Sequence, residues 1–565
     1  MALRSRKRQQ ITGVLLAIVV LATRIPFIDK MLFEFDSIDF AVALVRFDLS
    51  QVTPHMPGYI IHILFGRLIY ALLNNPHRAF LAVSILLSIG SVLALWRAAY
   101  HLRGERVALI TALLWISAPM FWFYGEVETV YPHEAFFASV ILWLGISLYR
   151  NRESAWRVIG LFVALSLATG ARQSSLLFFV PAVIYIMIVS KQSARVWMLA
   201  VASFTVVTTG WTLELFHEAG GFAAYLKFAQ AEHIYRSQSV LFGNPIGEHV
   251  AVMGKVALYL IAGGFSCWIV AAIALVGFRK RCLAFTRTAL SSQTFRFVVL
   301  VAQVPLLFYV LIYFMKAGYL LNVLPSVFLC GGVLVDQIAI WLAQNAKQKL
   351  ADRYILTRPL ITRRAIILTS MLVVLQVCWF VVPLPGKEEE RFRDAASQDS
   401  FSASVAKRYT NKGERTLAIL NRVFAYTSTA GVTCNDATNE KIFGALIHEW
   451  YQSPKPVTVL DTWWSRYAYV YMPFQQTYDI RTYPNARLAV GVEKDYLRHN
   501  VQDSVILLAH DSRTLILIRG DHPNLPQLAT QVHLRPINML KYLELYEIMD
   551  STFSMQWNGV RFLKQ

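Results

Sequence analysis

Long apolar runs separated by short polar loops fill the first two thirds of this 565-residue chain. Eleven runs are long enough, or nearly so, to cross a bilayer, which requires about 20 residues of straight helix. They lie at approximately 11–27, 79–99, 106–123, 134–149, 156–171, 173–190, 196–216, 250–278, 296–315, 318–343 and 364–384. This pattern predicts a mainly α, polytopic transmembrane bundle of about eleven spans.

One further apolar run, 57–73, is interpreted as a helix that enters the membrane without crossing it. His62 and Arg67 lie inside it, and an ionisable group at mid-bilayer costs several kcal/mol. If this run does not cross, basic loops such as the one with Arg103 and Arg106 all fall on the inner side, as the positive-inside rule requires. The N-terminus is then predicted to be cytoplasmic and the end of the chain extracytoplasmic.

The sequence changes at about residue 385 to a mixed polar composition. Strand-like and helical patterns alternate there, with strands expected at 416–420, 457–460, 504–508 and 515–518 and helices near 440–451 and 539–549. Asp511-Ser512-Arg513 between two of the strands predicts a hairpin turn. We therefore expect a transmembrane domain over 1–384, with a first outer loop at 28–78, and an extracytoplasmic α/β domain over 385–565.

Composition supports an integral membrane protein, because 56% of the residues are hydrophobic, only 16% are charged and the mean hydropathy is +0.45. The formal net charge of +19 could suggest nucleic acid as a partner. The cations instead concentrate in short loops between apolar runs, where they set orientation in a bilayer. The five cysteines form no CxxC motif or disulfide framework, and no P-loop, dinucleotide or serine-hydrolase motif occurs.

An acidic segment follows the first apolar run. Asp36 and Asp39 are three residues apart, so a helix would place both on one face at the outer membrane surface. A carboxylate at that position could accept a proton from a substrate hydroxyl. The alternative is structural: Asp36 would be a helix N-cap and Asp39 its first-turn partner.

Other unusual residues lie in further outer loops. The 126–134 segment holds three glutamates and a histidine, which could orient an acceptor or bind a metal; a solvated loop would explain these charges equally well. Arg172 and Lys316 stand at outer ends of apolar runs. A cation in that position must find a partner or snorkel to the interface.

In these residues the chain resembles the GT-C superfamily of polytopic glycosyltransferases that use lipid-linked sugars. Within it, the chain is most similar to the protein O-mannosyltransferases and the aminoarabinose transferases that modify lipid A. The resemblance rests on Asp-Ser-x-x-Phe-Ala at 36–41 and Pro-His-x-Pro-Gly-Tyr at 54–59, with shorter matches at 128–131, 172–174 and 318–325. It extends to the overall plan of a first span, two acidic outer loops and a C-terminal outer domain.

The resemblance implies an inverting transfer of sugar from a polyprenyl phosphate to a hydroxyl of a lipid, glycan or protein. The setting it implies is the outer face of a bacterial inner (plasma) membrane. The catalytic base maps onto Asp36, and eight further residues are expected to bind substrates: Asp39, His55, Tyr59, Glu128, Tyr131, Arg172, Lys316 and Tyr319. Ser37 follows Asp36 and neither loop has Asp-x-Asp, so no cofactor is expected, although a divalent metal could bind.

Two other kinds of protein could share this hydropathy pattern. A secondary transporter or lipid flippase would have paired inverted halves and charges near mid-membrane, whereas the unusual charges here lie at outer ends. A non-catalytic scaffold with a ligand-binding outer domain would not need Asp36. The position of the charges therefore favours the transferase.

Overall fold

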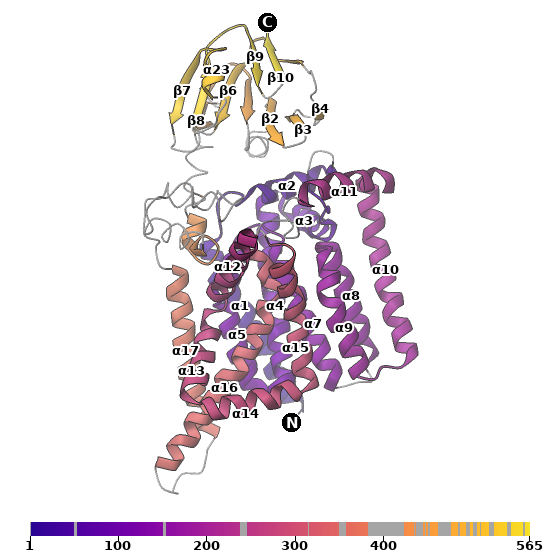
Figure 1. The fold of residues 1–565 in the computed structure, drawn as a ribbon, viewed down its shortest axis with the longest axis vertical. Coiled ribbons are helices and arrows are strands. Elements are labelled where there is room, and N and C mark those ends of the chain that lie inside the picture. The colour runs from indigo at the N-terminus through magenta and orange to yellow at the C-terminus, as the bar shows by residue number, and fades with distance from the viewer. Residues whose placement is uncertain are drawn as a thin grey trace. The chain divides into compact units, whose positions relative to one another are not determined.

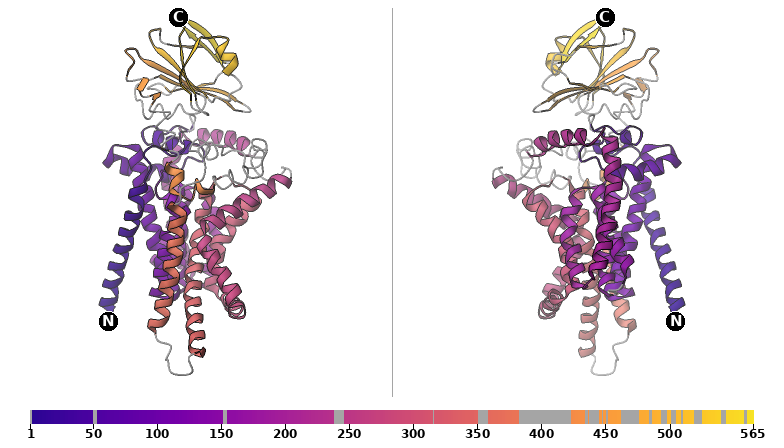
Figure 2. Two further views of the ribbon diagram at one scale, coloured as in Figure 1. Left: turned by 90° about the vertical axis from the view of Figure 1, so that its left-hand side faces the viewer. Right: turned by 90° about the vertical axis from the view of Figure 1, so that its right-hand side faces the viewer.

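The computed structural model consists of two compact units (Figures 1 and 2). The helical unit comprises Met1–Ile28, Tyr59–Gly386 and Asp394–Val432, and the sheet unit comprises Asp29–Gly58, Lys387–Arg393 and Thr433–Gln565. The structure describes residues 2–49, 53–150, 154–237, 246–314, 316–349, 358–381, 423–433, 436, 445–446, 448–449, 452–461, 476–483, 486–492, 498–500, 505–508, 510–518, 525–539, 544–557 and 560–565.

All eleven predicted apolar runs fold as helices or helix pairs in the helical unit. Its elements are α1 (Ala2–Arg24), η1 (Ile25–Phe27), α3 (Ile60–Leu73), α4 (Pro76–Arg103), α5 (Glu105–Ile116), α6 (Pro119–Tyr124), α7 (Tyr131–Arg150), α8 (Ala155–Ala171), α9 (Ser174–Val189), α10 (Ala194–Glu218), α11 (Phe222–Ser237), α12 (Ile246–Gly263), α13 (Phe265–Gly277), α14 (Arg279–Ser291), α15 (Gln293–Leu311), η3 (Ala317–Asn322), α16 (Leu324–Lys349) and α17 (Arg358–Val381). In Figure 1 the long helices run side by side, with α3 and α11 at one end and α14 across the other.

Small and hydroxylated residues let α4 approach its neighbours closely. A Cβ added to Gly90 would come within 2.6 Å of the Phe136 ring on α7. Ser91 Oγ lies 3.0 Å from Ser139 Oγ and accepts a hydrogen bond from Trp115 Nε1 at 3.0 Å. Packing of this kind replaces the hydrophobic driving force that is missing between helices in a bilayer.

The predicted number of eleven spans is not confirmed by the lengths of the helices. Among the residues that the structure describes, six helices are long and apolar enough to cross a membrane, or seven if α12 and α13, bent by 85°, count as one broken span. The count of eleven is not confirmed, because several runs form short or interrupted helices. The run at 106–123, for example, is divided into α5 and α6, and Pro119 begins the second helix.

The 57–73 run forms α3, which has 14 residues. At about 1.5 Å per residue it is roughly 21 Å long, less than the thickness of the hydrocarbon core, so the expectation that it does not cross stays open to test. Its two ionisable groups have partners within the bundle. His62 is stacked on Phe80 at 4.5 Å and Arg67 forms an ion pair with Glu218 of α10.

The sheet unit contains α2 (Phe35–Val45) and a C-terminal α/β region with two sheets. The seven-stranded sheet has the order β4-β3-β2-β1-β6-β8-β7, and β1 pairs in parallel with β2 and β6. The smaller sheet has the order β5-β10-β9. The bounds are β1 Val457–Asp461, β2 Gln476–Tyr483, β3 Ala486–Val492, β4 Arg498–Asn500, β5 Val505–Leu507, β6 Arg513–Ile518, α23 Leu525–Ala529, β7 Leu534–Met539, β8 Glu544–Ile548, β9 Phe553–Trp557 and β10 Val560–Lys564.

Three predicted strands are confirmed as β1, β5 and β6. The predicted strand at 416–420 lies outside the described residues, as does most of the 440–451 helix. The helix predicted at 539–549 is wrong, because this segment forms the end of β7 and then β8, where Leu545 pairs with Leu517. The hairpin at Asp511-Ser512-Arg513 is also wrong, since β5 pairs with β10 and β6 with β1 and β8.

Candidate active site

Asp36 lies in the first turn of α2, within the sheet unit. The N-cap of this helix is Glu34, which has extended backbone angles and makes no side-chain capping bond. The alternative that Asp36 is the N-cap is therefore wrong. A carboxylate in the first turn is stabilised by the positive end of the helix dipole, and the Asp36 side chain is 25% exposed. It is therefore accessible enough to exchange a proton.

Asp36, Asp39 and His55 come together in this segment. The backbone pairing of Asp48 with Thr53 folds the chain back after α2, and His55 Nδ1 lies 4.0 Å from Asp36 Oδ1. Asp39 is fully buried, and one ligand atom from each of the three residues lies within 4.8 Å of the others. Two carboxylate oxygens and one imidazole nitrogen at this spacing could hold a divalent cation.

Arg172 is the centre of a buried cluster in the helical unit. It follows α8, and its Nη1 lies 3.1 Å from Glu134 Oε1 on α7. Its guanidinium stacks on the Tyr319 ring at 3.7 Å from the centroid. Asn322 Nδ2 donates hydrogen bonds to Glu134 Oε2 at 3.1 Å and to the Tyr309 hydroxyl at 2.7 Å. The loops after α8 and α15 thus converge on the start of α7.

The charge of Arg172 is maintained despite burial. Desolvation by itself lowers the pKa of this guanidinium, but the oxygens of Tyr319 and Glu134 act in the opposite direction, and the net pKa lies above the ordinary arginine value. The alternative that Arg172 merely snorkels to the interface is wrong, because only 12% of its side chain is exposed. A permanently charged, partly shielded cation is well suited to an anionic ligand.

The predicted tyrosines lie around this cluster. The Tyr131 ring is 5.8 Å from that of Tyr319. A Cβ on Gly318 would come within 2.3 Å of Tyr131, so a glycine is required for this approach. Tyr59, the N-cap of α3, is buried, has the unusual positive φ of 44°, and contributes to the electrostatic environment of Arg172. Strained backbone of this kind persists where surrounding packing enforces it, often at functional sites.

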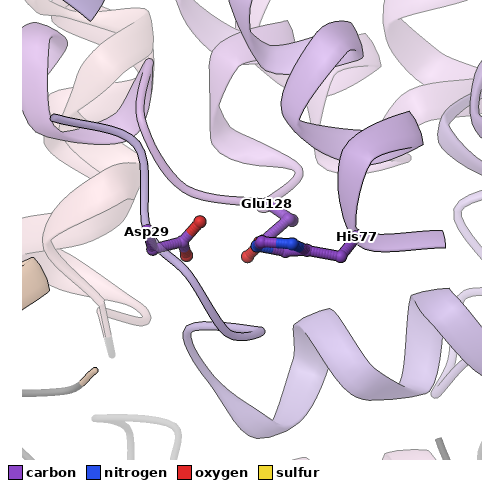
Figure 3. A group of neighbouring side chains, drawn as sticks. All are labelled: Asp29, His77 and Glu128. Atoms are coloured by element: carbon purple, nitrogen blue, oxygen red, sulfur yellow. The ribbon is translucent and has the colours of Figure 1, made fainter. Parts of the chain in front are cut away.

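Glu128 forms a pair with His77 in the helical unit, and Figure 3 shows the imidazole facing the carboxylate. Glu128 Oε1 lies 2.5 Å from His77 Nε2, and Glu128 is fully buried. The Asn75 side chain caps α4 by accepting from Arg78 N at 2.9 Å, which fixes the turn that carries His77. Asp29, also labelled in Figure 3, belongs to the sheet unit.

The 126–134 segment is not a solvated loop, because its three glutamates are all buried. Burial raises the pKa of Glu126, against the opposing effect of Arg24 at the end of α1. The Ser84 hydroxyl donates to Val127 O at 2.9 Å and holds this segment against α4. The charges are therefore part of the packed bundle.

The sequence pattern did not predict several residues of these clusters. Glu134 and Asn322 were not assigned as site residues, and His77 and Tyr309 gave no signal beyond their positions near apolar runs. Lys255 could have been found, since it is a lysine inside a long apolar run. It is buried in α12 with Nζ 5.8 Å from the centre of the Phe314 ring, which packs on Tyr319 at 5.9 Å.

Lys316 precedes η3 and is partly buried, three residues before Tyr319, which contacts Arg172. The structure thus brings six of the nine predicted residues into or beside clusters of the helical unit: Tyr59, Glu128, Tyr131, Arg172, Lys316 and Tyr319. The other three form the cluster in the sheet unit. Their roles as base and as substrate ligands stay predictions.

Comparison with known proteins agrees with this architecture. The family described as dolichyl-phosphate-mannose-protein mannosyltransferase matches residues 53–212. No curated protein matches the sequence. The crystal structure of ArnT from Cupriavidus metallidurans bound to undecaprenyl phosphate is similar, with 13% identity, a TM-score of 0.57, and 98% of this chain and 99% of that chain covered. Its apo state gives 13% identity, a TM-score of 0.54, and coverage of 96% and 98%.

Both ArnT structures share the fold of this chain over nearly its full length, which confirms the mainly α bundle followed by a C-terminal region with strands. The apolar helices identify an integral membrane protein. The family match lies on the part of the bundle that carries Tyr59, Glu128, Glu134 and Arg172. The chain is thus similar to the dolichyl-phosphate-mannose-protein mannosyltransferase family over residues 53–212, and it shares the fold of ArnT over nearly its full length.

Proposed function

We propose that this protein is a membrane glycosyltransferase of the GT-C superfamily, which moves a sugar from a polyprenyl phosphate donor to an acceptor hydroxyl, with inversion at the anomeric carbon. The observation that carries the proposal is the buried, charged Arg172, which Glu134 and Tyr319 hold in place. As the bond between sugar and phosphate breaks, negative charge grows on the phosphate, and a pre-oriented cation stabilises it. The related ArnT was crystallised with undecaprenyl phosphate, which supports a lipid phosphate as the ligand.

Arg172 has the geometry to position the donor phosphate. One Nη atom is engaged by Glu134, so the orientation of the planar guanidinium is fixed before a ligand arrives. Lys316 in the neighbouring turn supplies a second positive charge, and Tyr59, Tyr131 and Tyr319 supply hydroxyl groups for the sugar and phosphate. Exclusion of water by the bundle strengthens each of these interactions.

Asp36 acts in the proposal as the general base. Its carboxylate takes the proton of the acceptor hydroxyl, the acceptor oxygen bonds to the anomeric carbon, and the carbon–oxygen bond to the phosphate breaks to release polyprenyl phosphate. Asp39 and His55 position Asp36, and Glu128 helps to orient the acceptor. No metal is required. A divalent cation held by Asp36, Asp39 and His55 would instead supply positive charge for the leaving phosphate.

The proposed setting is a bacterial inner (plasma) membrane, with a cytoplasmic N-terminus and an extracytoplasmic C-terminal domain over 385–565. The acceptor is a lipid, glycan or protein that carries a free hydroxyl. The transporter or flippase alternative is less well supported, since the family that matches residues 53–212 is one of sugar transferases.

The Asp36→Asn variant tests the general base. Asparagine keeps the shape of the side chain but removes its charge and most of its basicity. General-base assistance contributes about 100- to 10,000-fold, so sugar transfer by the purified protein should fall at least about 100-fold with donor binding intact. Asp39→Asn is the matched variant on the same helix and should lose less. Near-normal transfer by the Asp36→Asn protein would exclude Asp36 as the base.

A further inference from the structure

Helix α14 connects two candidate membrane spans, α13 and α15. It spans Arg279–Ser291, and a single residue separates it from the end of α13 at Gly277 and from the start of α15 at Gln293. Both neighbours belong to candidate membrane spans. Figure 1 shows α14 lying across the end of the bundle, at a large angle to the long helices, and the side views of Figure 2 agree. α14 therefore lies at one end of the candidate membrane spans.

One face of α14 is fixed against α16. Arg281 Nη1 donates to Asn345 Oδ1 at 2.9 Å, and the ring of Phe285 lies 6.3 Å from that of Trp341. Trp341 also contacts Phe278, with ring centres 5.3 Å apart. These contacts determine which side of the helix faces the bundle, so the opposite side is presented outward.

The outward face combines apolar and basic residues. Leu283 and Leu290 are seven residues apart on one side of the helix and are 47% and 53% exposed. Arg279, Lys280 and Arg287 flank them and are also exposed. The sequence of α14 contains no acidic residue, and none of its residues is buried. The face thus carries a short leucine stripe bordered by three exposed cations.

We propose that α14 is a membrane-surface helix that binds the headgroups of anionic phospholipids. Its leucines enter the outer part of the acyl layer, and Arg279, Lys280 and Arg287 contact the phosphates. Helices with an apolar side and a basic side adopt this position in an interface. Charge contributes most of the affinity, because two leucines bury little area and a basic residue near an anionic surface is strongly attracted. The proposal does not depend on the proposed sugar transfer.

The test measures the affinity of the full-length, detergent-solubilised protein for fluorescent phosphatidylglycerol, with phosphatidylcholine as the neutral lipid. Each basic residue contributes about five-fold, so R279Q/K280Q/R287Q should bind phosphatidylglycerol on the order of 100-fold more weakly. The matched control R103Q/K191Q/R195Q removes three exposed cations at or next to the ends of other helices and should retain the wild-type affinity. Thermal unfolding checks that both variants are folded.

Equal losses in the two triple variants would overturn the proposal, and so would equal binding of the two lipids by the wild-type protein. If the first variant does not fold, L283S/L290S replaces it. That variant keeps all the charges, and its α14 should become more accessible to water-soluble reagents when the protein is in phosphatidylglycerol nanodiscs. Unchanged accessibility would show that α14 does not enter the interface.

Discussion

Replacing Arg172 by methionine can separate the structural role of this residue from its chemical role. Methionine fills part of the same space but has no charge, so the Glu134 carboxylate is left buried without its cation. Removal of one partner from a buried ion pair costs about 3–5 kcal/mol. Glu134 is 3% exposed but still accepts a hydrogen bond from Asn322 at 3.1 Å, so we expect a loss near the lower end, about 3 kcal/mol.

The double variant R172M/E134Q distinguishes the two roles. It removes both charges, and its glutamine oxygen can still accept from Asn322 Nδ2. Neutral replacement of a whole buried pair is often without net cost, so most of the lost stability should return. If Arg172 binds the donor phosphate, affinity for polyprenyl phosphate should stay low in both variants, since neither has the cation.

The assay pairs thermal or chemical unfolding of the purified protein with a binding measurement for polyprenyl phosphate. Glu134→Gln alone serves as the third corner of the cycle, which yields the coupling energy of the pair. Recovery of donor affinity in the double variant would remove Arg172 from the phosphate site. Wild-type stability of R172M would show that Glu134 and Arg172 do not form a buried pair.

Three further predictions address topology, acid stability and metal dependence. Single cysteines at Asn74 and at Arg103 should react from outside and from inside, respectively; the reverse result would contradict the eleven-span arrangement. The hydrogen bonds and charges of Arg513 and Arg535 lower the pKa of Glu547 below its usual range. The ionised Glu547 therefore stabilises the sheet unit fully at pH values above the pKa that glutamate has in the unfolded chain. This stabilisation is lost as the pH falls through the lower pKa of Glu547 in the folded protein. Hydrogen exchange of β6 and β8 at decreasing pH checks this, and Glu547→Gln should remove the pH dependence. Treatment with EDTA should leave sugar transfer unchanged, because Asp36 acts with a free carboxylate; a loss restored by Mg²⁺ or Mn²⁺ would assign the Asp36 cluster to a metal.

The sequence alone determined where the helices of the bundle lie. Each of the eleven apolar runs is helical in the structure, because a long apolar segment in lipid must satisfy its backbone hydrogen bonds within itself. The sequence also indicated the segments around Asp36, Glu128, Arg172 and Tyr319, because charged and tyrosine-containing motifs stand out against apolar surroundings. These features depend on neighbours within a few turns of the chain.

Tertiary structure decided which of these residues meet. Glu134 pairs with Arg172 and Asn322, which are 38 and 188 positions away, and no local pattern encodes such partners. Distant pairing also made a strand of 544–548, where β6 and β7 supply the hydrogen bonds that override a helical pattern. The span count depended on breaks such as those at Pro119 and between α12 and α13. Pro119 marks the first of these breaks in the sequence, whereas the 85° angle between α12 and α13 is seen only in the structure.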